Sequence, residues 1–342
     1  MAAGERTLIL AEGFSADHHY GKTMRGVMRY RRDDVVAVLD STRAGGTDAG
    51  VPVVGDVQGA LAFGPEVAIV GVATQGGRFP PEWRDILRAC IAKGLSIENG
   101  LHEMLADDSE LRPLADAAGV ELRDLRRPPE GLDCATGANL DVDSRIVLTV
   151  ASDCAVGKMT VSLELDRAAR ERGLESLFVP TGQTGIAIAG WGIAVDAVVA
   201  DFISGAAEQL VIEGHRRGGE LLWVEGQGSL VHPAYSGVTL GLYHGSVPHV
   251  LVLCHRAGST EIEGSPGHPI PPLRELVELH ERMALPRRPA RVAALALNTA
   301  GLGEREAREV VAAASDETGL PAADPVREGA DALLDAVLAG LP

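Results

Sequence analysis

The segment RIVLTVASDCAVGKMT, which runs from Arg145 to Thr160, decides the fold of the second half of this chain. Its first six residues are mostly apolar and predict a buried β-strand, and the residues after Thr160 predict a helix. Between them lies a loop of small residues that ends in Gly157 and Lys158. A strand, such a loop and a helix N-terminus direct backbone N–H groups at an anion, and the lysine reaches over it. The chain is therefore predicted to bind a phosphorylated ligand.

Composition limits the partners of the chain. It has 342 residues, of which 46% are apolar and 23% charged, as expected for a globular protein with room for two domains. The net charge of −17 argues against nucleic acid or an anionic membrane as a partner. We see no run long enough to cross a bilayer and no signal peptide, so a cytoplasmic location is expected. We also expect a homo-oligomer.

The four cysteines are far apart in the sequence, and none forms a CxxC pair. This spacing argues against a disulfide framework or a zinc site, and no metal is expected. Cys154 differs from the others because it lies in the phosphate-binding loop, at a helix N-terminus that would lower the pKa of its thiol. It is either a nucleophile or a small residue that fills the loop.

The rest of the sequence predicts two α/β domains. Short apolar runs within residues 7–98 alternate with helical segments and indicate a Rossmann-like parallel sheet over residues 1–125. Residues 126–143 are rich in proline, glycine and charge and are predicted to be a linker. A second series of strands and helices, over residues 144–342, forms a P-loop-type domain.

The loop departs from the standard GxxxxGK[ST] pattern. Ser152 stands at the first glycine position, and Met159 replaces the hydroxyl residue that follows the lysine. Thr160 comes one residue later, about 100° around the helix, which does not favour the usual coordination of Mg²⁺. The residues predicted to bind the phosphorylated ligand are Ser152, Asp153, Cys154, Ala155, Val156, Gly157, Lys158, Met159 and Thr160.

Other strand ends are predicted to border the same crevice, because ligands of open α/β sheets bind at the carboxyl ends of strands. The run LLWVEGQGS, from Leu221 to Ser229, ends a strand with a carboxylate, which makes Glu225 a candidate for a metal-binding or a proton-transfer role. The turn TGQTG, from Thr181, follows another strand. Asp201 either caps the helix that carries Glu208 or lines the site as a catalytic residue.

The segment from His232 to His244 is interpreted as a loop rich in functional side chains, in which His232 is a candidate base. Arg256 and Arg327 are candidate clamps for a substrate carboxylate, although either can form an ordinary ion pair. The residues predicted to contact substrate are Thr181, Gln183, Thr184, Gln227, Ser229, Tyr235 and Arg256.

The N-terminal half gives weaker signals for a ligand. Gly13, Gly21, Lys22 and Thr23 imitate a phosphate loop, but seven residues separate the glycines, so an anion-binding loop and a simple turn both stay open. No GxGxxG is present. A dinucleotide site would therefore rest on Asp40 alone, which is more simply a cap at a strand end.

Five motifs together resemble one family: SDCAVGKMT, VPTGQTG, VDAVVADFISGAAE, VEGQGSLVHPAYSGVTLGLYHG and ALNTAGL. They are similar to the family called domain of unknown function 1611, whose characterised members are N-acetyltransferases of D-amino acids, D-glutamate in particular. The C-terminal half also resembles the dethiobiotin-synthetase branch of P-loop folds. The resemblance implies that acetyl-CoA is the phosphorylated ligand and that a D-amino acid is the acceptor.

For such a reaction the candidate catalytic residues are Glu225, His232 and Asp201. Glu225 or His232 would remove the proton of the ammonium group, and the backbone amides of 226–229 would stabilise the oxyanion. Direct transfer is the expected route, and a covalent route through Cys154 is the lesser alternative.

Two other functions stay open. One is an ATP-dependent kinase or ligase with a modified P-loop, for which nucleotide and Mg²⁺ would be the cofactors. The other is a regulator that binds a nucleotide or coenzyme A without catalysis.

Overall fold

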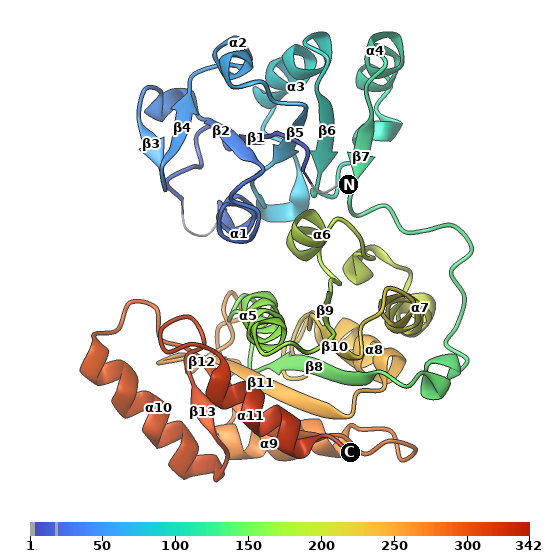
Figure 1. Cartoon of the computed structure of the whole chain (residues 1–342), viewed down its shortest axis with the longest axis vertical. Coiled ribbons are helices and arrows are strands. Elements are labelled where there is room, and N and C mark those ends of the chain that lie inside the picture. The colour runs from blue at the N-terminus through green and yellow to red at the C-terminus, as the bar shows by residue number, and fades with distance from the viewer. Residues whose placement is uncertain (1–3, 18–19) are drawn as a thin grey trace. The chain divides into compact units, whose positions relative to one another are not determined.

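The structure is a computed structural model that describes residues 4–17 and 20–342. Its internal contacts divide the chain into two compact units. The N-terminal unit contains Met1–Pro128 together with Gly182–Ala197, and the C-terminal unit contains Pro129–Thr181 together with Val198–Pro342. Each unit has its own β-sheet covered by helices, which confirms the predicted α/β class (Figure 1).

The N-terminal sheet has the strand order β3-β4-β2-β1-β5-β6-β7 and is parallel except for the pair β3 and β4. Its strands are β1 (Thr7–Leu10), β2 (Val35–Leu39), β3 (Thr47–Asp48), β4 (Val51–Val54), β5 (Val67–Val70), β6 (Ser96–Asn99) and β7 (Leu122–Asp124). The helices of this unit are α1 (Lys22–Tyr30), α2 (Val57–Ala60), α3 (Trp83–Ala92), α4 (Leu111–Ala118) and α6 (Gln183–Ala189).

Apolar residues fill both faces of this sheet because successive side chains of a strand point to opposite faces. Leu8 and Leu10 of β1 pack in one cluster with Trp83 of α3. Ile9 packs in the other cluster with Met24 of α1. This explains why the strands are continuous apolar runs, from which a doubly covered parallel sheet was predicted.

Asp40, at the end of β2, fills the loop that follows β1. Its carboxylate accepts hydrogen bonds from the amides of Gly13, Ser15 and Thr42. It also accepts hydrogen bonds from the hydroxyls of Ser15 and Thr42. Burial would raise the pKa of Asp40, but the hydrogen bonds outweigh it and lower that pKa. The cap interpretation is confirmed, and the amides of Gly13 and Ser15 already have an anionic partner.

The C-terminal sheet has the order β13-β12-β11-β8-β10-β9, and all its strands are parallel. Its strands are β8 (Arg145–Ala151), β9 (Ser176–Val179), β10 (Leu221–Val224), β11 (Val250–Arg256), β12 (Arg291–Asn298) and β13 (Ala322–Ala323). The helices of this unit are α5 (Lys158–Glu171), α7 (Ile203–Arg216), α8 (Ser236–Ser246), α9 (Leu273–Arg282), α10 (Glu304–Thr318) and α11 (Asp331–Gly340).

The position of β8 determines where a ligand can bind. It lies between β11 and β10, so the strand order reverses at β8, and the carboxyl ends of β8 to β11 lie at one edge of the sheet. On one face of the sheet, Leu165 of α5 and Leu333 of α11 pack with Val147 and Trp223 in a single buried cluster. The helix α5 is thereby fixed at the end of its strand.

The segment after His232 differs from the prediction. It was interpreted as a loop, but Ser236–Ser246 form the helix α8, which packs on α7. Its glycines and short polar residues mask the helical period. Gly245 is needed there, because a Cβ on it would lie 2.1 Å from the backbone oxygen of Ser204. Among the described residues, we find no helix with the length and hydropathy that a membrane crossing requires.

Exchange of Gly245 for alanine tests this packing. We expect Gly245→Ala to lower the free energy of unfolding by about 1–3 kcal/mol, because backbone atoms of α7 must move to admit the methyl group. Gly237→Ala is the matched control in the same helix, since nothing lies within 4 Å of its Cβ position. Chemical denaturation followed by circular dichroism measures both. Equal stability of the two variants would contradict the close contact of α7 and α8.

Candidate functional site

The loop after β8 has the geometry of a phosphate-binding turn. It spans Ser152–Gly157, between the end of β8 at Ala151 and the start of α5 at Lys158. Ala155 and Gly157 have φ angles of 53° and 118°, in the left-handed region that only glycine adopts at low cost. A non-glycine residue held there indicates a backbone conformation that the surrounding structure enforces.

Lys158 points back into this loop. Its side chain is buried, and its ammonium group donates a hydrogen bond to the backbone oxygen of Asp153 at 3.0 Å. Burial lowers the pKa of Lys158, while the nearby Cys154, Asp153 and Glu225 act in the opposite direction. A ligand phosphate would supply the full counter-charge that the backbone oxygen lacks.

Asp153 closes the other side of the loop. Its two carboxylate oxygens accept the amides of Cys154 at 2.6 Å and of Glu263 at 2.8 Å. The side chain therefore ties the loop to the segment after β11. Met159 and Thr160 lie half-buried in the first turn of α5.

A polar network fixes the base of the loop. The Ser152 hydroxyl lies 2.8 Å from Nδ1 of His255, and the Ser229 hydroxyl donates to the Ser152 backbone oxygen at 3.0 Å. Burial lowers the pKa of His255, so the neutral ring is favoured. Ser229, a predicted substrate residue, is completely buried and holds the loop in place.

The end of β10 lies beside the loop, as predicted. Glu225 is 5% exposed, and one of its oxygens accepts the Thr181 amide at 2.9 Å. The hydroxyl of Thr181 donates to the Glu225 backbone oxygen and accepts the Gln227 side-chain amide at 3.1 Å. These three predicted residues therefore form one connected group.

Gly226 explains why a glycine follows this carboxylate. Its amide donates to the Thr149 hydroxyl of β8 at 2.9 Å. A Cβ at this position would lie 1.8 Å from the Thr149 backbone oxygen and 2.9 Å from Cδ of Lys158. Only glycine allows β10 to approach the lysine so closely.

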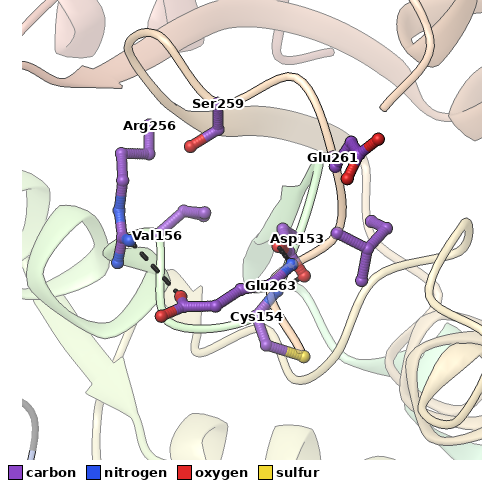
Figure 2. A pocket seen from close by; sticks show the side chains of 8 residues that line it. Asp153, Cys154, Val156, Arg256, Ser259, Glu261 and Glu263 are labelled. Atoms are coloured by element: carbon purple, nitrogen blue, oxygen red, sulfur yellow. Dashed lines mark hydrogen bonds and ion pairs between the residues drawn. The ribbon is translucent and has the colours of Figure 1, made fainter. Parts of the chain in front are cut away.

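A pocket of about 350 Å³ opens at the loop (Figure 2). Its walls combine one guanidinium, three carboxylates, a thiol, a hydroxyl and two aliphatic side chains. The lining residues are Asp153, Cys154, Val156, Arg256, Ser259, Glu261, Ile262 and Glu263.

Arg256 contributes the positive charge of this pocket. It donates to the backbone oxygen of Ala155 at 3.0 Å, and its Nη1 lies 3.3 Å from the Glu263 carboxylate. In Figure 2 the side chains of Arg256 and Glu263 point toward one another. Arg256 thus lies beside the loop and forms the ordinary ion pair that was the alternative to a carboxylate clamp. A ligand carboxylate would compete with Glu263 for this guanidinium.

The sequence interpretation missed Ser259, Glu261, Ile262 and Glu263. They follow β11, the strand beside β8, in a segment without a recognisable motif. Only their position after β11, the strand that pairs with β8, could have indicated that they lie near the phosphate loop.

His232 and Tyr235 lie together. Their ring centroids are 4.5 Å apart, and Tyr235 is 53% exposed while His232 is 6% exposed. Nδ1 of His232 accepts the Ala234 amide at 3.0 Å. A ring nitrogen of His232, the Cys154 thiol and an Asp153 oxygen all lie within 4.8 Å of one another.

Two of the predicted substrate residues contact residues other than the phosphate loop and Glu225. Thr184 and Gln183 belong to the N-terminal unit, where the Thr184 hydroxyl lies 2.9 Å from that of Thr23 and Gln183 packs on Gly100. The prediction that the whole 181–185 turn borders the crevice is therefore correct for Thr181 and not supported by the contacts of the other two. The turn starts α6 instead.

Asp201 is exposed in a short 3-10 turn, Ala200–Phe202, and α7 has no side-chain cap, so the predicted cap is wrong. Glu208 of α7 instead accepts the amides of Thr136 and Gly137. Arg327 donates to the Thr299 hydroxyl and to two backbone oxygens, so it holds the turn after β12.

The fold and the loop define a P-loop α/β protein with an added Rossmann-like domain. Residues 133–334 match the P-loop domain model, and residues 39–128 the Rossmann-like N-terminal domain model, of the domain of unknown function 1611. The chain belongs to this family, which confirms the resemblance. It is 42% identical to a crystal structure of a family member from Anabaena variabilis ATCC 29413, with a TM-score of 0.92 over 98% of this chain and 99% of that one.

Two relatives carry the name D-glutamate N-acetyltransferase. The relative from Tritonibacter scottomollicae is 36% identical over 98% of this chain and 99% of its own length. The relative from Pseudoalteromonas sp is 37% identical over 80% of this chain and 82% of its own length. The names of these relatives indicate an enzyme.

Removal of the Lys158 charge tests the loop. If the loop holds the phosphates of coenzyme A, as the resemblance implies, Lys158→Met should weaken its binding roughly 10- to 100-fold, because one charge-assisted hydrogen bond is lost. The control is Lys93→Met, an exposed lysine at the end of α3. Isothermal titration with coenzyme A measures both variants. Unchanged binding by Lys158→Met would show that the loop does not hold the phosphates.

Proposed function

We propose that the protein transfers an acetyl group from acetyl-CoA to the amino group of a D-amino acid, with D-glutamate as the first candidate. The observation that carries this proposal is the relative named D-glutamate N-acetyltransferase, which aligns with nearly the whole chain at 36% identity. The site chemistry described above is consistent with both substrates of such a reaction.

The loop suits the phosphates of acetyl-CoA. The helix N-terminus of α5 and the buried Lys158 offer positive charge to a pyrophosphate. Acyl transfer requires no cleavage of a phosphate bond. The displaced Thr160 and its unfavourable position for Mg²⁺ therefore do not count against this ligand.

The pocket beside the loop suits the charged groups of an amino acid. Arg256 is the partner for a carboxylate, and Glu261 and Glu263 are partners for an ammonium group. Val156 and Ile262 provide the apolar contacts that an acetyl methyl group needs. The pocket thus offers complementary groups for an amino acid and for the acetyl group it receives.

Glu225 is the better candidate for the base that deprotonates the amine. Its carboxylate is buried at the end of β10, and one of its oxygens accepts the Thr181 amide. The Nδ1 lone pair of His232 is engaged by the Ala234 amide, so its neutral ring carries the proton on Nε2 and acts as a donor. His232 therefore favours stabilisation of an anion over proton removal.

Acetyl-CoA and a panel of D- and L-amino acids test the activity. We expect continuous thiol release over many turnovers only with acetyl-CoA and a D-amino acid, fastest with D-glutamate, and without ATP. We expect Glu225→Gln to lower kcat about 10²- to 10⁴-fold and His232→Ala to lower it less. Thiol release assays measure these rates. Wild-type kcat in both variants would exclude both residues as the base, and an ATP requirement would contradict the proposed reaction.

A further inference from the structure

Three chemically active side chains meet at the phosphate loop. An Asp153 oxygen, the Cys154 sulfur and a ring nitrogen of His232 lie within 4.8 Å of one another. Asp153 and His232 are 3% and 6% exposed, whereas Cys154 is half-buried and lines the pocket. The cluster therefore adjoins the space that a ligand can enter.

Such a cluster can bind a metal or support a nucleophile. A histidine that binds a metal gives one nitrogen lone pair to the ion and usually donates the other N–H. Nδ1 of His232 instead accepts the Ala234 amide, so the neutral ring presents an N–H at Nε2. Both oxygens of Asp153 also accept backbone amides. This arrangement does not favour a metal-ligand set, and it leaves the Nε2–H of His232 as a donor within the cluster that contains the thiol.

We infer that Cys154 is the nucleophile of the proposed acetyl transfer and carries the acetyl group as a thioester between the two half-reactions. This inference rests on the proposed function. Lys158 interacts electrostatically with Cys154, and the loop leads into the positive N-terminal end of α5. Both features favour the thiolate, which is the reactive form of a cysteine.

The two half-reactions balance without an oxidant or reductant. In the first, the Cys154 thiolate attacks the carbonyl carbon of acetyl-CoA, and the bond from that carbon to the coenzyme A sulfur breaks. Coenzyme A leaves as its thiolate and takes up the proton that the Cys154 thiol released. In the second, the neutral amine attacks the Cys154 thioester, the carbon–sulfur bond breaks, and the amide forms. The proton lost by the amine passes to the base, and the Cys154 thiolate is restored.

The position of Cys154 in the pocket is consistent with the covalent route. Cys154 lines the same pocket as Arg256, Glu261 and Glu263, the proposed partners of the amino acid. An acetyl group on Cys154 would therefore lie at the edge of the pocket in which we place the amino acid. Coenzyme A could leave before the acceptor binds, so both substrates need not occupy the pocket at the same time.

Intact-protein mass spectrometry with acetyl-CoA and no amine is the decisive experiment. We expect the wild-type protein to gain the mass of one acetyl group, which peptide mapping places on Cys154 and hydroxylamine removes. D-Glutamate should also remove the label and yield N-acetyl-D-glutamate. The matched control is Cys134→Ser, because Cys134 is an exposed thiol and lies outside the loop; this variant should be labelled as the wild type is.

Kinetics of Cys154→Ser complete the test. We expect kcat to fall roughly a hundredfold or more while thermal unfolding stays unchanged, and the wild type to give parallel lines in double-reciprocal plots. An unlabelled wild type that transfers acetyl groups, or a Cys154→Ser variant with normal kcat, would overturn the inference and leave the proposed function intact. Stoichiometric zinc on Cys154, with activity lost on chelation, would also overturn it. Labelled Cys154 without transfer to any amine would support the thioester and contradict the proposed acceptor.

Discussion

The burial of the Lys158 ammonium is the constraint on which the site depends. A buried charge is stable only if polar groups surround it, and here the loop itself turns a backbone oxygen toward the lysine. The approach of β10 through Gly226 and the left-handed conformations of Ala155 and Gly157 follow from the need to enclose this side chain. Burial also removes water from the ammonium group, and the backbone oxygen that it contacts carries no full negative charge. An anion bound at the loop would therefore be stabilised by this lysine.

The parallel sheet brings the other residues of the site to the loop that contains Lys158. Because β8, β9, β10 and β11 end at one edge, their following residues meet although they are far apart in the sequence. Thr181, Glu225 and Arg256 each follow or end a different strand. The charges around the pocket thus come from the topology of the sheet rather than from one contiguous motif.

The sequence was sufficient for the loop, for Glu225 and for most strands, because buried parallel strands are apolar runs and the Gly157-Lys158 turn has a recognisable pattern. It was insufficient for α8, where glycines and hydroxyl residues replace the apolar stripe of a surface helix. It also did not predict that α6 joins the N-terminal unit, since contacts between segments that are distant in the sequence leave no local period. Glu261 and Glu263 were missed because an ordinary surface loop has the same composition.

Asp40 gives the Rossmann-like domain a property of its own. In dinucleotide-binding proteins an acidic residue at this strand end holds a ribose, and the glycine-rich loop beside it stays open for the pyrophosphate. Here the carboxylate has turned inward and serves as a permanent, covalently attached substitute for that external anion. The domain has a Rossmann-like fold, but a dinucleotide could bind to these amides only if it first displaced the side chain of Asp40.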